Sequence, residues 1–226
     1  MKKTLKMAVN MLVSMPKTVY LNFKLFDVKT ALRLPILVSW NTKLHVGGAK
    51  RGNVELRNWD KHYHVFYGFG GSDHIISNKY GLLQIGEKGQ VIFHGNAHFS
   101  EGCSLRCDYG RISFGSEFSA NKNCCINCEL DMEFGDKVLF GWNVTVRDTD
   151  GHAVFENQEK KISQKRVRVG NHVWVCSYSD ILKGSAIGND CVVAWRSCVL
   201  NSITQNNVLI AGSPAKVLKT NINWEK

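Results

Sequence analysis

The chain has 226 residues, 44% of them hydrophobic, which is enough for one sizeable folded domain, so the composition excludes a disordered chain. Twenty-nine basic against nineteen acidic residues give a formal net charge of +10, which favours anionic partners: phosphate-bearing cofactors, nucleic acid or an anionic membrane surface. No apolar run approaches the roughly 18 residues that a membrane-spanning helix requires.

The first 45 residues are predicted to form one or two short amphipathic helices, with Pro16 and Pro35 as helix breakers. The start, MKKTLKMAVNMLV, is basic and briefly apolar, but Asn10 interrupts it and no small-residue cleavage site follows, so we expect no signal peptide. This basic segment is a candidate for peripheral contact with a membrane. Residues 46–92, rich in glycine, histidine and aromatic residues, are expected to form irregular opening coils.

A six-residue repeat runs through the carboxy-terminal part of the chain. Aliphatic residues recur at Val169, Val175, Ile181, Ile187, Val193 and Val199. This spacing fits neither one face of an α-helix nor the two-residue alternation of a single strand. It fits a short strand followed by a turn, so that three units close a triangular coil of 18 residues.

The same period extends upstream with small insertions. The matching triplets are Phe93, Phe99 and Leu105; Phe114, Ala120 and Ile126; and Phe134, Phe140 and Val146. Their first members lie 21 and 20 residues apart, so each upstream coil carries two or three extra residues at a corner. We therefore predict five stacked coils with parallel strands and a continuous core.

The eight cysteines are interpreted through this repeat. Cys103, Cys124 and Cys191 fall at the small fifth positions, so small buried side chains are favoured over a disulfide set. Cys124 and Cys128 frame one CxxC-like pair without a second, which supports zinc only weakly. Reduced thiols and the missing signal peptide together favour the cytoplasm.

The segments VGNHVWV, ILKGSAIGNDCVV and VLIAGSPAKVLK resemble the hexapeptide-repeat acyltransferases, most closely their sugar O-acetyltransferases, over about residues 80 to 220. The resemblance implies an all-β fold, a left-handed parallel β-helix. It is expected over residues 46–215, with a loop extruded at 153–168, after the short amino-terminal helical segment. The tail, residues 216–226, is expected to be a short helix. The resemblance also implies a homotrimer that uses acetyl-coenzyme A.

One histidine occupies a special place in the repeat. The six-residue step after Val146 lands on His152, and the repeat then breaks until about Val169. Long insertions at one point of a regular array are usually functional. In the resembling family a histidine at the root of such a loop is the general base, and NVTVRDTDGH matches that stretch. Asp150, Asp148 or a backbone carbonyl could orient its ring, and the sequence does not choose among them.

Other roles follow from the resemblance alone. Asn121 matches a position that holds the acceptor, although an asparagine ladder at a β-helix corner explains it equally well, and Asp148 is a second candidate for substrate binding. The positions that match the coenzyme A site are Ser177, Ala194 and Trp195 along the arm, Gly212 and Pro214 at the turn, and Lys216 and Lys219 near the phosphates. Trp195 and Cys176 depart from the small residues that the family commonly has there.

The predicted function is therefore acetyl transfer from acetyl-coenzyme A to a hydroxyl of a sugar or surface-polysaccharide precursor. N-acetylation of an amino sugar and an inactive trimeric scaffold are the alternatives. His94 and His98 suggest a zinc site resembling that of gamma-class carbonic anhydrases, but that family lacks the AGSPAK ending, so we expect no metal. Basic residues cluster beside His152 at 160–168, which suits a phosphorylated cofactor better than nucleic acid.

Overall fold

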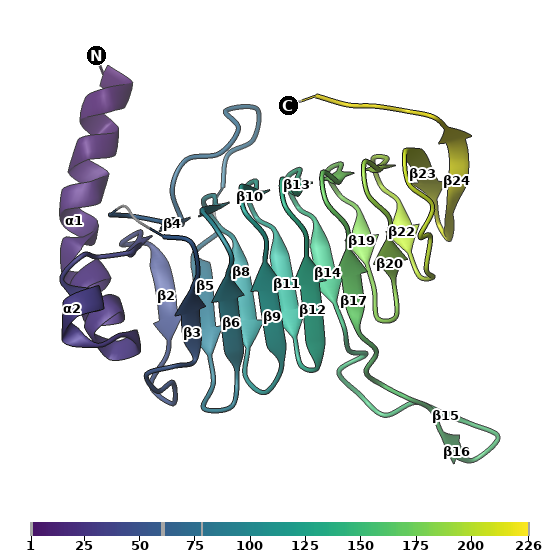
Figure 1. Ribbon diagram of the computed structural model, residues 1–226, viewed down its shortest axis with the longest axis horizontal. Coiled ribbons are helices and arrows are strands. Elements are labelled where there is room, and N and C mark those ends of the chain that lie inside the picture. Colours follow the sequence, from purple (N-terminus) through teal and green to yellow (C-terminus); the bar gives the residue numbers. More distant parts are fainter. Residues whose placement is uncertain (1, 60–61, 78, 226) are drawn as a thin grey trace.

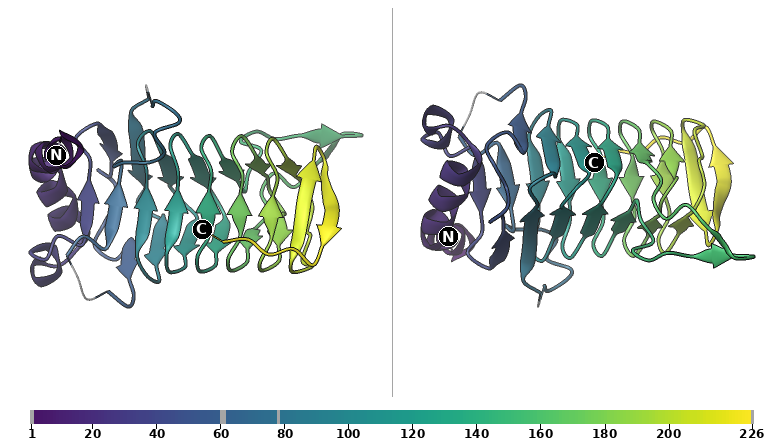
Figure 2. Two further views of the ribbon diagram at one scale, coloured as in Figure 1. Left: turned by 90° about the horizontal axis from the view of Figure 1, so that it is seen from above. Right: turned by 90° about the horizontal axis from the view of Figure 1, so that it is seen from below.

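The computed structural model describes residues 2–59, 62–77 and 79–225. Short parallel strands wind into a triangular prism of stacked coils, with a long helix across one end and a two-stranded hairpin at the other (Figure 1). Each coil passes through three sheets, here called A, B and C. The corners where the chain passes from one sheet to the next are the AB, BC and CA edges. Figure 2 shows the strands of successive coils in line along the prism.

Three sheets form the faces of the prism. Sheet A contains β1 (Ile36–Val38), β4 (Val65–Tyr67), β7 (Ala97–Phe99), β10 (Phe118–Ala120), β13 (Leu139–Phe140), β18 (Trp174–Val175), β21 (Val192–Val193), β23 (Val208–Gly212) and β24 (Ala215–Thr220). Sheet B contains β2 (Thr42–His45), β5 (Gly81–Ile85), β8 (Ser104–Cys107), β11 (Cys125–Cys128), β14 (Thr145–Arg147), β19 (Asp180–Ile181) and β22 (Cys198–Val199). Sheet C contains β3 (Val54–Leu56), β6 (Gln90–Phe93), β9 (Arg111–Phe114), β12 (Asp131–Phe134), β17 (Val167–Val169) and β20 (Ala186–Ile187).

The six-residue repeat sets the core. All residues that the repeat predicts to point inward are buried, and equivalent positions of successive coils pair directly, as Phe114 pairs with Phe134 and Val175 with Val193. The cysteines at the predicted fifth positions are buried as well. Both predictions are confirmed, because every inward residue of one coil packs on its counterpart in the next and so stays out of water.

The coils begin earlier than predicted. Strands β1 and β2 already pair in parallel with β4 and β5, so the prism starts at Ile36, ten residues before the expected boundary at residue 46. Residues 46–92 contain regular strands rather than irregular coils. The six-residue spacing is hidden there because long connections, 57–64 and 68–80, separate strands that still stack in register.

One continuous helix, α1 (Lys2–Leu25), covers the first coil, followed by the short α2 (Val28–Ala31). Pro16 lies inside α1, so its prediction as a helix breaker is wrong. Its ring faces solvent, where water can hydrate the backbone carbonyl that loses its helical partner. The other side of the helix is held on the prism, which outweighs the cost of the proline.

Polar side chains attach α1 to the open edge of sheet A. Asn22 donates to the backbone oxygen of Ile36 at 2.7 Å and accepts from its N–H at 3.1 Å. Thr18 makes the same pair of bonds to Val38, at 3.2 and 3.1 Å. Ser14 accepts from the N–H of residue 40 at 2.9 Å. Four-residue spacing aligns these three side chains on one helix face, where they satisfy an edge strand that has no neighbour.

The opposite end is closed by backbone pairing. Strand β24 runs antiparallel to β23, so the predicted helix in the tail is wrong. A hairpin fits here because the last strand of sheet A needs partners for its backbone groups. The chain then turns back along the prism, where Trp224 stacks on His172 with ring centroids 4.2 Å apart (Figure 1).

An asparagine and aspartate ladder runs along the CA edge. Each carboxamide or carboxylate oxygen accepts a backbone N–H of the preceding coil at 2.8 Å or closer. Its members are Asp136, Asn171, Asn189 and Asn206. Such a ladder was one explanation for Asn121, but Asn121 lies on the AB edge.

Candidate functional site

The root of the extruded loop is anchored by a buried carboxylate. Asp148 follows β14 and is fully buried. It accepts N–H bonds from three consecutive residues of the preceding coil, 129 to 131, at 2.8 to 2.9 Å. Three bonds to one side chain fix the direction in which the chain leaves the prism. This geometry gives Asp148 a structural role and does not support the predicted contact with substrate.

The loop itself stands away from the prism. It closes with backbone bonds from Asp150 to Ser163 and from Lys165 to Asp148, both at 2.9 Å. Its tip is a small hairpin of β15 (Phe155–Glu156) and β16 (Glu159–Lys160), which projects at the BC edge (Figure 1). The predicted loop is therefore an exposed arm, but its predicted end at residue 168 is wrong, because Val167 and Arg168 already pair with β12 as part of β17.

His152 sits on this arm just beyond the base, with its side chain exposed. Among the described residues, none forms a hydrogen bond with its ring. Asp150 is directed elsewhere, because its carboxylate is 2.5 Å from the Lys183 ammonium of the next coil. Lys183 also donates to the backbone oxygen of Ile162 at 2.6 Å. Lys183 thus connects the arm to the coil that follows it, a role that nothing in the six-residue pattern indicates.

The predicted donor-site residues share the AB edge. Backbone bonds at this edge link residue 121 to 140, 141 to 175, 176 to 193 and 194 to 210, so the corners stack in register along the prism. Ser177 and Ala194 lie on neighbouring corners of this row. The Ser177 hydroxyl is buried and accepts the backbone N–H of Trp142 at 3.0 Å, so its structural contribution is to join two corners.

Asn121 opens the same row. Its side-chain oxygen accepts the N–H of Ser72 and of Lys122, each at 2.9 Å. The Lys122 ammonium donates to the backbone oxygen of Ile75 at 3.0 Å. Asn121 and Lys122 therefore attach Ser72 and Ile75, in the connection between β4 and β5, to the AB edge.

Aromatic side chains form a patch on the AB edge that the sequence did not reveal. Trp195 is 50% exposed and packs edge-on against Trp142, with ring centroids 5.6 Å apart. Tyr178 lies 5.2 Å from Trp195, and the Arg196 guanidinium lies over the Tyr178 ring at 5.5 Å. The pairing of successive corners brings these residues together, although they come from three coils.

Two members of this patch have an unfavourable backbone. Tyr178 and Arg196 adopt φ of 61° and 55°, at the corner position where Asn123 and Asn143 stand in earlier coils. Asparagine tolerates this left-handed region, whereas a bulky side chain there costs roughly 1 kcal/mol. Such strain is typical of residues retained for their side chains.

The closing hairpin carries the remaining predicted residues. Gly212, with φ of 102°, ends β23 and donates its N–H to the Ser197 hydroxyl at 3.2 Å. Lys216 and Lys219 lie on β24 with exposed side chains. The turn at Pro214 joins the two strands at the end of the AB row.

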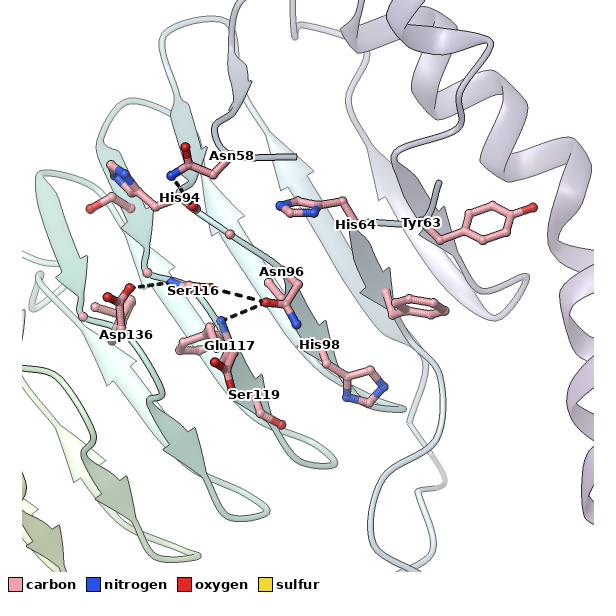
Figure 3. Close-up of a pocket in the computed structure, with 18 of the residues that line it drawn as sticks. Asn58, Tyr63, His64, His94, Asn96, His98, Ser116, Glu117, Ser119 and Asp136 are labelled. Carbon is pink, nitrogen blue, oxygen red and sulfur yellow. Dashed lines mark hydrogen bonds between the residues drawn. The ribbon is translucent and has the colours of Figure 1, made fainter. Parts of the chain in front are cut away.

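Within one chain the predicted base and the predicted donor site are separated. The row lies on the AB edge and His152 on the BC edge, with sheet B between them. A third feature, an open cavity of about 1250 Å³, lies on the CA edge. Figure 3 shows its polar wall, where Asn58 bonds to the backbone of His94, and where Asn96 and Asp136 hold the Ser116 turn. His94 and His98 both line this cavity, and in the described ranges no cluster of three metal-ligating side chains occurs.

Known proteins resemble this chain in sequence. The galactoside O-acetyltransferase of Escherichia coli K12 is 35% identical over 114 residues, which is 49% of this chain and 55% of that enzyme. The putative lipopolysaccharide biosynthesis O-acetyl transferase WbbJ of the same strain is 30% identical over 147 residues, 57% of this chain and 74% of WbbJ. The chain spans about half the length of several curated relatives that it matches. No family model matches it.

A solved structure shares the fold. The polySia-specific acetyltransferase NeuO superposes with a TM-score of 0.59 over 82% of this chain and 79% of NeuO, at 19% sequence identity. At this identity the likeness concerns the architecture of the coils.

Proposed function

The chain belongs to the hexapeptide-repeat acetyltransferases, which fold as left-handed parallel β-helices, and from this premise we propose that it transfers acetyl from acetyl-coenzyme A to a hydroxyl of a sugar or surface-polysaccharide precursor. The observation that carries the proposal is His152. It is exposed on an arm whose base is fixed by the three N–H bonds of Asp148. A scaffold has no need of a solvent-exposed imidazole on so firmly anchored a loop.

The proposed chemistry is general base catalysis. The neutral His152 imidazole takes the proton of the acceptor hydroxyl as its oxygen attacks the thioester carbonyl, and the imidazolium returns that proton to the departing thiolate. An imidazole, with an ordinary pKa of about 6.5, is suited to both steps near neutral pH. The exposed Lys216 and Lys219 would attract the phosphates of the donor, in line with the net charge of +10.

We propose a homotrimer because one chain does not assemble a complete site. A cyclic trimer that sets the AB edge of one chain against the BC edge of the next would bring His152 to the row of Ser177 and Ala194. Trp195 then stands beside the proposed pantetheine path and narrows it. The cytoplasm is the proposed compartment, since all eight cysteines are unpaired.

Replacing His152 tests the catalytic role. His152→Asn should lower kcat by about 100-fold, the usual contribution of a general base, while acetyl-coenzyme A binding by calorimetry stays unchanged. Asp150→Asn is the matched control and should cost much less, because Asp150 pairs with Lys183 rather than with the ring. The assay is transfer to a panel of sugars that includes amino sugars. Near wild-type turnover by His152→Asn would favour the scaffold or another base.

Mixing two inactive variants tests the shared site. Ala194→Glu places a charged side chain in the donor row, and His152→Asn removes the base. In randomly mixed trimers about a quarter of the sites combine an intact His152 from one chain with an intact row from the next. Co-expression should therefore restore roughly that share of wild-type activity. No recovery in mixed trimers would place both groups of a site on one chain.

A further inference from the structure

Helix α1 differs from an ordinary surface helix, because it exposes an apolar face while polar side chains are buried beside Leu21 and Leu25 on the face against the prism. The face against the prism carries the polar ladder of Ser14, Thr18 and Asn22, all fully buried. The opposite face is apolar and exposed, with Leu12 at 71% and Tyr20 at 54% exposure. Further exposed residues of this helix are Met7, Val9, Val13, Val19 and Phe23. A surface helix normally hides this face and shows its polar one.

The exposed face lies on the end of the molecule. Figure 1 shows α1 across the end of the prism, at a steep angle to the long axis, with its first turns extending past the coils. The short helix α2 at the same end adds Val28 and Leu32, both exposed. The prism therefore presents an apolar end surface, called here the α1 face, far from the closing hairpin. Contiguous apolar surface of this kind marks an interaction site.

The charge of α1 identifies the class of partner. The helix contains five lysines and no acidic residue. Two of them, Lys17 and Lys24, donate to backbone oxygens of the first coil, so they lie beside the apolar face rather than on it. Pairing of two α1 faces would bring together two cationic helices that contain no acidic residue of their own. An anionic lipid surface instead complements both the lysines and the apolar stripe.

We propose that the α1 face docks on an anionic membrane surface, with the apolar side chains at the level of the acyl chains and the prism standing away from the bilayer. Among the described residues, no helix is long and apolar enough to cross a bilayer, so the contact is one of a helix lying in the interface. The proposal is independent of the acetyltransferase activity, because none of its residues belongs to the AB row or the arm.

Vesicle sedimentation with the full chain tests the proposal. The wild type should sediment with vesicles of phosphatidylcholine and phosphatidylglycerol, and much less with phosphatidylcholine alone or at high salt. The double variant Leu12→Glu with Tyr20→Glu should partition roughly tenfold less or weaker still. Both side chains point to solvent, so its thermal unfolding should match that of the wild type.

A matched control separates the α1 face from general stickiness. Ile76→Glu with Tyr109→Glu changes two apolar residues outside α1 that are more exposed than the first pair, at 81% and 71%, and vesicle binding should be unaltered. The proposal fails if the wild type ignores anionic vesicles, or if both double variants lose binding equally. Sedimentation equilibrium gives a further contrary outcome. The proposal also fails if the wild type binds no vesicles and the α1 variant, unlike the control variant, differs from the wild type in oligomeric mass. That result would assign the face to a second copy of the chain.

Discussion

The coils before the extruded loop are broader than the coils after it, although both follow one six-residue repeat. Phe93, Phe114 and Phe134 pair in successive coils 21 and 20 residues apart, whereas Val169 and Ile187 pair 18 residues apart. In sheets B and C the strands before the loop have three to five residues, whereas β19, β20 and β22 after it have two. The arm with His152 leaves the prism where one width changes to the other.

The two widths need different cores. In the broad coils a stack of phenylalanines fills the centre, and Phe114 lies 5.3 Å from Phe93, Phe99 and Phe134, measured between ring centroids. In the narrow coils single valines and isoleucines suffice. The predicted donor row lies mainly on the narrow coils, whereas the stack of phenylalanines lies in the broad coils.

The largest effect is expected from opening the broad core. Phe114→Ala should lower the free energy of unfolding by about 3–5 kcal/mol, because it removes a ring that contacts four others. Val193→Ala in a narrow coil should cost only about 2 kcal/mol, since fewer carbon atoms are lost. Urea denaturation measures both. Equal losses would mean that the width of the coil does not govern packing.

A smaller effect is expected at the boundary between the halves. Asp148→Asn should lower the free energy of unfolding by about 2–3 kcal/mol, because an amide cannot accept the three N–H bonds equally well. The KM for the acceptor should not change. Asp150→Asn is the control and should cost less than about 1 kcal/mol, since its ion pair is partly exposed. A raised acceptor KM with unchanged stability would restore the predicted contact of Asp148 with substrate.

The smallest effect concerns one thiol, that of Cys176, on the AB edge of the narrow coils. Burial disfavours the thiolate and raises the pKa of Cys176 to about 11. The thiol therefore stays protonated at neutral pH, and its alkylation should accelerate only as the pH rises toward that value, well above the range of a free cysteine. Peptide-resolved mass spectrometry after iodoacetamide treatment at several pH values measures this. Rapid alkylation of Cys176 at pH 8 would show that the corner is open to solvent.

Much of the fold could be predicted from the sequence, because a repeat that buries one residue in six leaves a periodic record. The inward positions, the parallel stacking, the buried cysteines and the insertion after Val146 all follow from spacing. The six-residue period is not visible where connections are long, so it does not indicate the coil formed by residues 36–56. The period also ends at both ends of the prism, where the chain must supply hydrogen-bonding partners for the unpaired backbone of the terminal strands.

The surroundings of the candidate site were decided by the tertiary structure. Spacing predicts His152 at the root of the loop, and the family resemblance alone indicates Ser177 and Ala194. Only the stacking of corners brings Trp142, Tyr178 and Trp195 into one patch. Only the path of the chain buries Asp148 under the preceding coil.

The helix α1 illustrates the same division. Its composition alone predicts a basic amphipathic helix, and the sequence determines that one side is apolar. Which side faces the prism depends on the unpaired backbone of β1 and of Trp40 after it. These groups require hydrogen-bonding partners, which Thr18 and Asn22 supply to β1 and Ser14 supplies to Trp40. A buried peptide group without a partner costs more than an exposed leucine, so the three polar side chains turn inward together with Leu21 and Leu25, and the apolar face remains outside.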